Sequence, residues 1–433
     1  MFFSLVLVMV SFITAMGVME SILIFSIMML KMFIIESSQP MLINFSFFCD
    51  HLSSFLICIS LWVTSFMILS LKKFHSYYSS FLNFKLIMSL LLILSTLFTV
   101  LKSIIFFCMF EVSMIPILLI IWGWGYQPER LDALFKIFFF TSVPSSPFLI
   151  YLLWNEHSWI IPLKTFKTNT MNSLTTFMIF SFFLVKMPMF SIHQWLPKAH
   201  VEAPLIGSMI LASVLLKLGS YGLLRFSLCI DLYTSYMLKS LSGLGMLLSS
   251  LYCMLSPDNK SVVAYSSISH MNFMISSICT GKETSLLGSV IMMIAHAFTS
   301  SGLFFMSDMM YTRLKTRSII VIKSSNNCCF SISFGWLLFS AFNMSFPLTS
   351  SNLGEITMAM WLVINSFPLK MILLSYFFLS GMYSMYLFYM TTHSKMANKT
   401  LFIPPMSTKE SLVIFKISMP FITFPLITYL ITI

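Results

Sequence analysis

Six ionisable side chains lie well inside long apolar stretches of this 433-residue chain: Glu111, Lys186, Lys217, His270, His296 and Glu355. On the translocon-insertion scale each charged one costs at least about 2.5–3.5 kcal/mol at membrane depth, so two lysines and two glutamates together cost ~10 kcal/mol or more. That sum is comparable with the stability of a whole protein. Histidine titrates near neutral pH, and burial or a neighbouring charge changes how tightly lysine and glutamate hold a proton. The set therefore indicates proton transfer through buried water.

Helix breaks accompany two of these residues and favour a transport function. Pro188 follows Lys186, and Pro347 and Gly354 precede Glu355. Proline removes a backbone hydrogen bond and bends a helix, and non-helical backbone at membrane depth persists only within protein or beside water. Broken helices in the two halves of a chain are typical of inverted-repeat transporters with binding sites near the midplane.

A structural role for the same residues is the alternative. Two glutamates and two lysines could form buried ion pairs that lock helices together. A lone buried histidine is more often a satisfied core residue than a proton carrier. Pairing across helices is not visible in one sequence, so both hypotheses stay open at this stage.

Composition places the chain in the membrane. Hydrophobic residues make up 58% of it and charged residues only 9%, and the mean hydropathy is +0.92. A soluble domain carries about 25% charged residues, so we expect an integral membrane protein. The net charge of +11 is not gathered into a basic face with interleaved aromatic residues, so we expect no nucleic-acid partner.

The apolar stretches predict an all-α polytopic fold. A helix needs about 20 apolar residues to cross the hydrocarbon core. Fourteen such stretches are centred roughly on residues 9, 27, 61, 92, 112, 142, 182, 216, 245, 270, 296, 345, 380 and 421. The run from 329 to 366 is interrupted by FNMSFPLTSSNLGE. We interpret that run as one discontinuous span, with two separate spans as the alternative.

Basic residues in the connections predict the orientation. One face holds Lys72, Lys73, Arg130, Lys198, Lys260, Arg313, Lys315, Arg317, Lys323, Lys395, Lys399 and Lys409. The opposite face has few, chiefly Lys164, Lys167 and Lys282. The positive-inside rule places the basic face on the side of synthesis and both termini on the other side. In a mitochondrion the basic face would be the matrix side.

The stretch HQWLPKAHVEAP (193–204) contains three further polar candidates, His193, His200 and Glu202. One interpretation is an interfacial connector with Trp195 anchored at the lipid headgroups. The other is proton uptake through the three polar side chains. The two histidines are seven residues apart without a third convincing ligand, so we expect no metal site.

The sequence indicates no redox cofactor on this chain. Its eight cysteines are scattered without a CxxC pair, which gives no support for cysteine-ligated zinc or iron–sulfur clusters. The segment GWGYQP has Pro128 where a dinucleotide-binding loop needs its third glycine, and no GxxxxGK[ST] occurs. Any redox cofactor that the function requires must therefore lie on other chains.

Several longer motifs resemble a known family. They are FEVSMIPILLIIWGWGYQPERLDA (110–133), KMPMFSIHQWLPKAHVEAPLIGSMILASVLLKLGSYGLLR (186–225), DNKSVVAYSSISHM (258–271), MIAHAFTSSGLFF (293–305) and NLGEITM (352–358). They resemble the chain 4 family of mitochondrial NADH–ubiquinone oxidoreductase, among the antiporter-like, proton-pumping subunits of respiratory complex I. The resemblance covers roughly residues 85 to 400.

The resemblance implies a bundle of fourteen helices with two inverted five-helix repeats and two discontinuous helices. It divides the chain into N-terminal helices (1–83), a first repeat (84–234), a second repeat (235–392) and a linker with a last helix (393–433). It also implies that Glu111 pairs with Lys186 on the seventh helix and that Lys217 bridges the two halves. The two histidines would lie on a central polar axis.

The resemblance finally implies an enzyme subunit in the mitochondrial inner membrane, where the orientation predicted from the basic residues would put both termini in the intermembrane space. Glu355 would exchange protons with one side, and protons would move from matrix to intermembrane space. FMN and iron–sulfur clusters are expected on partner subunits. The expected partners are other membrane-arm subunits of complex I, including antiporter-like neighbours, and membrane lipids. A cation/proton antiporter, free-standing or multisubunit, is the alternative function, and a structural spacer is a third.

Overall fold

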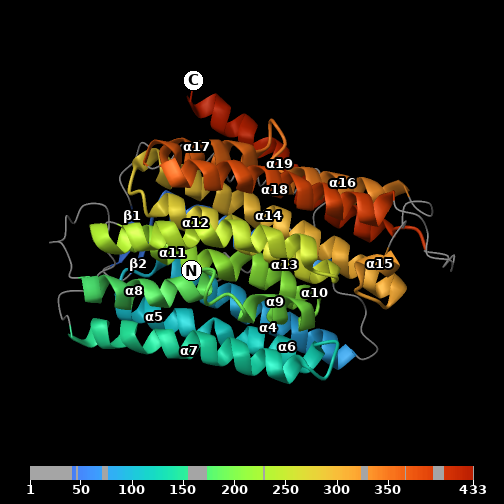
Figure 1. Ribbon diagram of the computed structural model, residues 1–433. Helices are drawn as coiled ribbons and strands as arrows, with labels where there is room; N and C mark the ends of the chain where they lie inside the picture. Colours follow the sequence, from blue (N-terminus) through green and yellow to red (C-terminus); the bar gives the residue numbers. More distant parts are fainter. Residues whose placement is uncertain are drawn as a thin grey trace.

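The computed structural model describes residues 41–44, 47–70, 77–154, 173–227, 230–322, 330–365, 367–393 and 404–432. These residues form a bundle of helices that lie side by side (Figure 1). A short antiparallel hairpin of β1 (Met41–Asn44) and β2 (Phe47–Cys49) precedes the first described helix. The helical class predicted from the sequence is confirmed, and the hairpin was not predicted. The spans expected around residues 9 and 27 lie outside the described residues.

Eight helices in the described part are long and apolar enough to cross a membrane, where α5 and α6 count as one, as do α10, η3 and α11. The longest elements are α3 (His51–Ser70), α4 (Tyr77–Thr99), α7 (Arg130–Trp154), α12 (Leu232–Leu255), α13 (Asn259–Ile278), α14 (Glu283–Leu314), α18 (Phe367–Thr392) and α19 (Thr408–Thr432). The shorter ones are α5 (Ser103–Val112), α6 (Met114–Trp124), α8 (Ser173–Lys186), α9 (Trp195–Glu202), α10 (Leu205–Ile210), the π-helical segment η3 (Leu211–Leu215), α11 (Leu216–Phe226), α15 (Ile319–Ile322), α16 (Phe330–Asn343) and α17 (Ser350–Asn365). Each span centre predicted from residue 61 onward falls in one of these helices or, for residue 345, in the break between α16 and α17.

The first helix break separates α8 from α9. Pro188 has no N–H to donate, and the next donor, Met189, bonds to the Leu184 carbonyl at 3.2 Å. The carbonyl of Val185 instead accepts the indole N–H of Trp195 at 3.1 Å. Trp195 is only 1% exposed, so its interpretation as an anchor at the headgroups is wrong. Its ring fills the break, and its N–H satisfies a carbonyl that the break leaves free.

The second helix break separates α16 from α17. Ser345 and Leu348 have positive φ values of 53° and 72° on either side of Pro347. Such values are unusual for residues other than glycine, particularly for one as bulky as leucine. They turn the chain sharply, so that α17 begins at Ser350.

The two halves of the second broken helix lie against the same neighbour. Gly302 of α14 faces Phe339 of α16, and Gly354 of α17 faces Met292 of α14. Along this contact the residue numbers of α14 decrease from 302 to 292 while those of its partners increase from 339 to 354, so both halves run antiparallel to α14. Figure 1 shows α16 and α17 following one another along the bundle. This packing favours one discontinuous span over two separate ones. In the same way, α8 and α9 both pack against α7.

Candidate proton path

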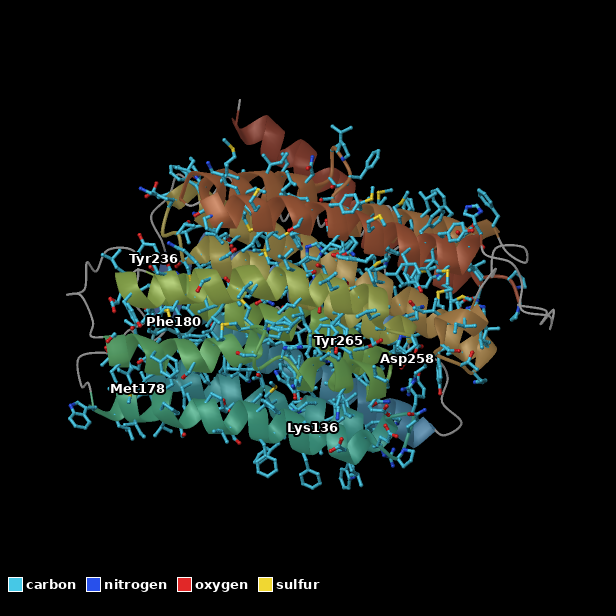
Figure 2. All side chains as sticks on the ribbon, in the orientation of Figure 1. Lys136, Met178, Phe180, Tyr236, Asp258 and Tyr265 are labelled. Carbon is cyan, nitrogen blue, oxygen red and sulfur yellow. The ribbon has the colours of Figure 1, made fainter. Side chains whose placement is uncertain are left out.

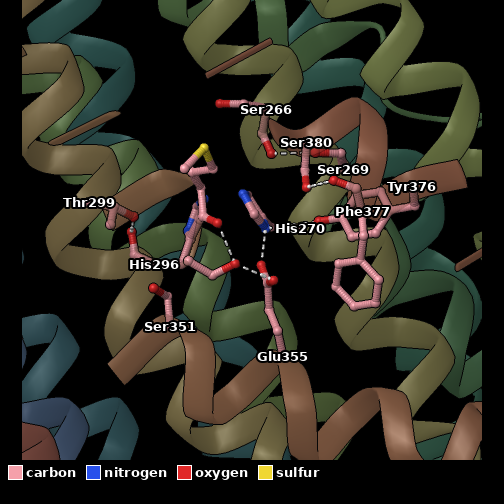
Figure 3. A network of polar contacts seen from close by, with 12 residues as sticks. Ser266, Ser269, His270, His296, Thr299, Ser351, Glu355, Tyr376, Phe377 and Ser380 are labelled. Carbon is pink, nitrogen blue, oxygen red and sulfur yellow. Dashed lines mark hydrogen bonds and ion pairs between the residues drawn. The ribbon is translucent and has the colours of Figure 1, made fainter. Parts of the chain in front are cut away.

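Four of the six candidates come together in the centre of the bundle. Lys217 Nζ lies 2.8 Å from His296 Nδ1. The rings of His296 and His270 are 5.8 Å apart between centroids, and His270 Nδ1 is 3.5 Å from Glu355 Oε1. All four residues are at most 3% exposed. Figure 3 shows His270 between His296 and Glu355. They form one series of groups that can each carry a proton.

A π-helical segment positions Lys217, the first member of the series. Leu211–Leu215 form π-helix immediately before it, and single π turns occur frequently at functional sites. Lys217 Nζ also donates to the carbonyl of Ala212 within this segment at 2.7 Å. The ammonium group is thus held between a carbonyl oxygen and an imidazole nitrogen.

The second helix break positions Glu355, the last member. Ser345, within the break, donates its hydroxyl to Glu355 Oε2. A cavity of about 560 Å³ opens beside the carboxylate, lined by Ser345, Asn352, Ala359 and Phe377 among others. The carboxylate therefore has a hydrogen-bond donor and His270 on the protein side and open space on the other.

Glu111 and Lys186 are neighbours without a direct ion pair. Lys186 Nζ sits 4.1 Å from the ring centroid of Phe110 and donates to the Phe110 carbonyl at 3.4 Å. Among the contacts of the described residues, none joins Lys186 to the Glu111 carboxylate within 4.0 Å, although the two lie within electrostatic range. Glu111 is half-buried, and in the described part of the chain its Oε1 has no hydrogen-bond partner.

The helix that carries Glu111 is interrupted beside it. Pro116 has no N–H for the Val112 carbonyl, four residues earlier. Accordingly α5 ends at Val112 and α6 begins at Met114. The carboxylate therefore projects from the last turn of a helix at a weakened point of its hydrogen-bond ladder.

The three residues proposed for proton uptake each contact a different partner. Glu202 bonds to Arg317 at 3.1 Å and, with Asp132 and Lys198, lines a cavity of about 400 Å³. The ring of His200 stacks on Phe304 with centroids 4.4 Å apart, and that of His193 on Phe190 at 4.5 Å. Within the described ranges, no hydrogen bond joins them to the central four residues. His200 is within electrostatic range of Lys217.

Comparison with known proteins places the chain in a family. The model of the family "NADH:quinone oxidoreductase/Mrp antiporter, TM" matches residues 101–382. NADH-ubiquinone oxidoreductase chain 4 of Rhipicephalus sanguineus is 39% identical over 381 residues, which cover 87% of each chain. The chain 4 protein of Ceratitis capitata is 41% identical over 365 residues, or 82% of this chain and 81% of that one. This chain belongs to the NADH-ubiquinone oxidoreductase chain 4 family.

Solved structures share the fold across much larger sequence differences. A chain of respiratory complex I from Thermus thermophilus is 18% identical, with a TM-score of 0.80, over 98% of this chain and 95% of its own. A chain of an archaeal membrane-bound sulfane sulfur reductase is 15% identical, with the same TM-score of 0.80, over 99% and 94%. The bundle of the chain 4 family is therefore an architecture common to distant respiratory membrane complexes.

One buried pair was missed in the sequence. Lys260 was counted among the basic residues of a connection, yet it is 1% exposed and lies 3.7 Å from Asp308, which is 4% exposed. Tyr126 donates to the same aspartate at 3.0 Å. Backbone bonds from Asn259 N to Arg317 O and from Ile319 N to Pro257 O draw the two connections together over the bundle end. The charge of Asp308 inside FFMSDMM was the signal that could have revealed this pair.

Three hydroxyl groups of the central site were also missed. They belong to Ser345, Tyr376 and Tyr383. Serine and tyrosine are common in membrane helices, so their types carry no functional signal by themselves. Their position opposite His270 and Glu355 follows only from the packing of α13, α17 and α18. As for metals, no group of three or more His, Cys, Asp or Glu side chains lies together in the residues that the structure describes.

Proposed function

We propose that this chain moves protons from the matrix to the intermembrane space as a membrane subunit of NADH:ubiquinone oxidoreductase, through Lys217, His296, His270 and Glu355. Family membership makes it an enzyme subunit. The observation that carries the path is the series of four buried titratable groups, with contacts of 2.8 Å and 3.5 Å at its two ends and the two histidine rings 5.8 Å apart between them. NADH oxidation and quinone reduction would take place on partner subunits that carry FMN and iron–sulfur clusters.

Proton movement along the series requires three transfers. The Lys217 ammonium gives a proton to His296 Nδ1, at 2.8 Å. The 5.8 Å between the two histidine rings exceeds a hydrogen bond, so a water molecule completes the transfer to His270. His270 then gives a proton from Nδ1 to Glu355 Oε1. From there the proton leaves through the cavity of about 560 Å³ beside the carboxylate.

Proton uptake would occur at the basic end of the bundle. The cavity of about 400 Å³ that Glu202 lines lies at that end. Figure 2 shows Asp258 toward that end and Met178 and Tyr236 toward the other. Buried His200 would pass protons toward Lys217, and His193 would assist. By the positive-inside rule the basic end is the matrix side, and both termini lie in the intermembrane space.

Glu111 and Lys186 would control the path. A carboxylate close to a buried lysine stabilises the ammonium form, and its withdrawal favours proton release. Because Glu111 is half-buried on α5, next to exposed Val112 and Ile115, a neighbouring membrane-arm subunit or lipid would cover it. A charge change in such a neighbour would then act on Lys186 through Glu111.

The inverted-repeat organisation belongs to the same proposal. Residues 84–234 and 235–392 would form two related five-helix units, each with one broken helix, within a bundle of fourteen helices. The support is the equivalent placement of the two breaks, each of which lies against one long neighbouring helix, α7 or α14.

The alternative function is a cation/proton antiporter, a class that the family description also includes. The relatives that match most of the chain are named as oxidoreductase subunits, which favours the enzyme subunit. Native electrophoresis of membranes solubilised in mild detergent distinguishes the two. We expect this chain to migrate with a very large complex that stains for NADH dehydrogenase activity. Migration alone, or with a few small partners and no activity, would establish the antiporter instead.

The path itself is tested with Lys217→Met in the intact complex, reconstituted into liposomes. Methionine keeps the bulk of lysine but carries no proton, so NADH-driven pumping should fall at least about tenfold. The matched control is Lys85→Met, since Lys85 is an exposed lysine on α4, and it should pump normally. Full coupled turnover of the Lys217→Met complex would contradict a role for Lys217 in the path.

A further inference from the structure

Three oxygen atoms compete for the two ring nitrogens of His270. Tyr376 Oη lies 3.0 Å from its Nδ1, and Glu355 Oε1 lies 3.5 Å from the same atom. Tyr383 Oη lies 3.3 Å from Nε2. Figure 3 shows Tyr376 and Glu355 both directed at His270. One nitrogen cannot serve both groups at once, because it offers either one lone pair or one hydrogen.

When His270 is neutral, Tyr376 can occupy Nδ1. The tyrosine hydroxyl then donates to the Nδ1 lone pair, and the ring hydrogen must be on Nε2. From there it is donated to Tyr383 Oη, which is itself 3.4 Å from Ser269 Oγ. In this arrangement Nδ1 neither gives a proton to Glu355 nor takes one from it.

When His270 carries a second proton, Tyr376 must release Nδ1. Both ring nitrogens of an imidazolium are donors, so the Tyr376 hydroxyl hydrogen has to turn away. The Nδ1 hydrogen then has the Glu355 carboxylate as its acceptor. Transfer to Oε1 leaves His270 neutral with its hydrogen on Nε2, the state in which Tyr376 can donate to Nδ1 again. Because Nε2 keeps its hydrogen, the second proton enters at Nδ1, where it displaces the Tyr376 hydroxyl, and the same nitrogen then gives one proton to Glu355.

We propose that Tyr376 is a valve on the proton path: while its hydroxyl occupies Nδ1 of His270, no proton passes between His270 and Glu355 in either direction, so that uncontrolled return of protons from Glu355 is slowed. The proposal rests on the function proposed above. Tyr376 is a positioning residue for His270 and carries no proton of the pump itself. Its consequence is tighter coupling: pumping persists against a membrane potential because protons exchange more slowly between His270 and Glu355 when no transfer is driven.

The packing around Tyr376 suits a switch that moves only a hydrogen. Its buried ring lies 5.4 Å from the ring of Phe273 and 5.6 Å from that of Phe377, between centroids. Two aromatic neighbours at this distance hold the ring in place. Rotation of the hydroxyl hydrogen about the C–O bond is then enough to open or close Nδ1.

Other charged or polar groups also face His270. His296 approaches from α14, Lys217 from α11 and Asn343 from the end of α16. They meet the ring from elements other than α18, which supplies Tyr376 and Tyr383. A change confined to α18 hydroxyls therefore tests the valve without removing a member of the proton series.

The test uses Tyr376→Phe in the intact complex, reconstituted into liposomes, with protons pumped per NADH measured against increasing membrane potential. Without the hydroxyl, Nδ1 stays open to Glu355. We expect the ratio to match the wild type at zero potential and to fall more steeply as the potential rises. Proton leak in the absence of NADH should also increase.

Tyr383→Phe is the matched control, because it removes the same atom from the same helix but on the Nε2 side. It should lower pumping at all potentials without steepening the dependence. A Tyr376→Phe complex that follows the wild type at every potential, or that loses pumping equally at every potential, would overturn the valve.

Glu355→Asp tests the valve if Tyr376→Phe prevents assembly. The shorter carboxylate withdraws from Nδ1, so the Tyr376 hydroxyl should occupy Nδ1 more often. Pumping should then slow without a steeper dependence on membrane potential. A steeper dependence would contradict the valve. Glu355→Gln separates the two proposals. If that variant pumps fully, the proposed function fails, whereas if it stops pumping while Tyr376→Phe behaves as wild type, only the valve fails.

Discussion

The break between α8 and α9 and the break between α16 and α17 each have an ionisable residue beside them, yet the two surroundings differ. Lys186 ends α8 and lies against the ring and carbonyl of Phe110, without a carboxylate in contact among the described residues. Glu355 lies in α17 with Ser345 on one oxygen and His270 beside the other. A break alone therefore does not make a proton path. The neighbouring helices determine whether the ionisable group beside the break contacts other titratable groups.

The packing around the two sites explains this difference. Phe182 lies 4.4 Å from Phe110 and 4.8 Å from Phe148 between ring centroids, so the first site is enclosed by aromatic rings. The second site is lined by hydroxyl and imidazole groups. Apolar walls keep the Lys186 charge sensitive to distant carboxylates because they screen poorly, whereas hydroxyl groups provide places for protons to move. The first site thus suits control and the second suits transfer.

From this comparison we expect Glu355→Gln to lower proton pumping more than any other single substitution considered below. Glutamine keeps the size of glutamate and can still bond to Ser345, but it cannot accept a proton from His270. NADH-driven pumping in reconstituted complex should fall at least about tenfold, while native electrophoresis shows normal assembly. Normal pumping by this variant would remove the second site from the path.

Glu111→Ala should have a smaller effect, since it disturbs control without removing a member of the connected series. We expect lower NADH-driven pumping in a complex that still assembles, measured in the same liposome assay. The structural alternative from the sequence makes the opposite prediction. If Glu111 locks helices through an ion pair, the variant complex should fail to assemble.

Gly219→Ala should affect stability more than pumping. The added Cβ would meet the backbone nitrogen of Met187 at 2.7 Å, where α11 crosses the end of α8. Overpacking of this kind costs about 1–3 kcal/mol, which a lower thermal unfolding temperature of the purified complex would report. Gly381→Ala is the control, because nothing lies within 4 Å of its added Cβ. Equal unfolding temperatures for the two variants would show that the crossing tolerates the extra atom.

Phe110→Leu should have the smallest effect. It removes the ring 4.1 Å from Lys186 Nζ but leaves the Phe110 backbone carbonyl as acceptor. A buried cation–π contact contributes on the order of 1–2 kcal/mol, so the pH at which pumping is half-maximal should move while maximal pumping stays close to wild type. A loss as large as that of Glu355→Gln would mean that the first site is part of the transfer series.

Much of the site was predictable because charge at membrane depth is expensive. Glu111, Lys186 and Lys217 stood out from the sequence for this reason, and four of the six selected residues proved to form one series. The helix breaks at Pro188 and Pro347 were predictable because proline has a fixed effect on the helix ladder. The cost of burying charge thus identified the ionisable residues, and the effect of proline on helix hydrogen bonds identified the helix breaks.

The contacts between helices were not predictable. The sequence suggested that Trp195 is a membrane anchor, since tryptophan commonly is one. In the structure its indole N–H instead donates to the Val185 carbonyl within the helix break. The sequence suggested that Lys260 is a charge in a connection, whereas in the structure it is buried beside Asp308 under the two paired connections. Tyr376 carried no signal at all, because its role depends on which face of α18 meets α13. These features arise from tertiary packing, which one sequence without structure does not specify.

The most direct test of the account is whether Lys217 and Glu355 act in one series. Proton pumping per NADH would be measured for Lys217→Met, for Glu355→Gln and for the double variant, in complexes that assemble equally. Residues that act as a unit are strongly non-additive, so the double variant should be no more impaired than the worse single one. If the two losses instead multiply, protons use two independent routes, and the single path through His296 and His270 is wrong.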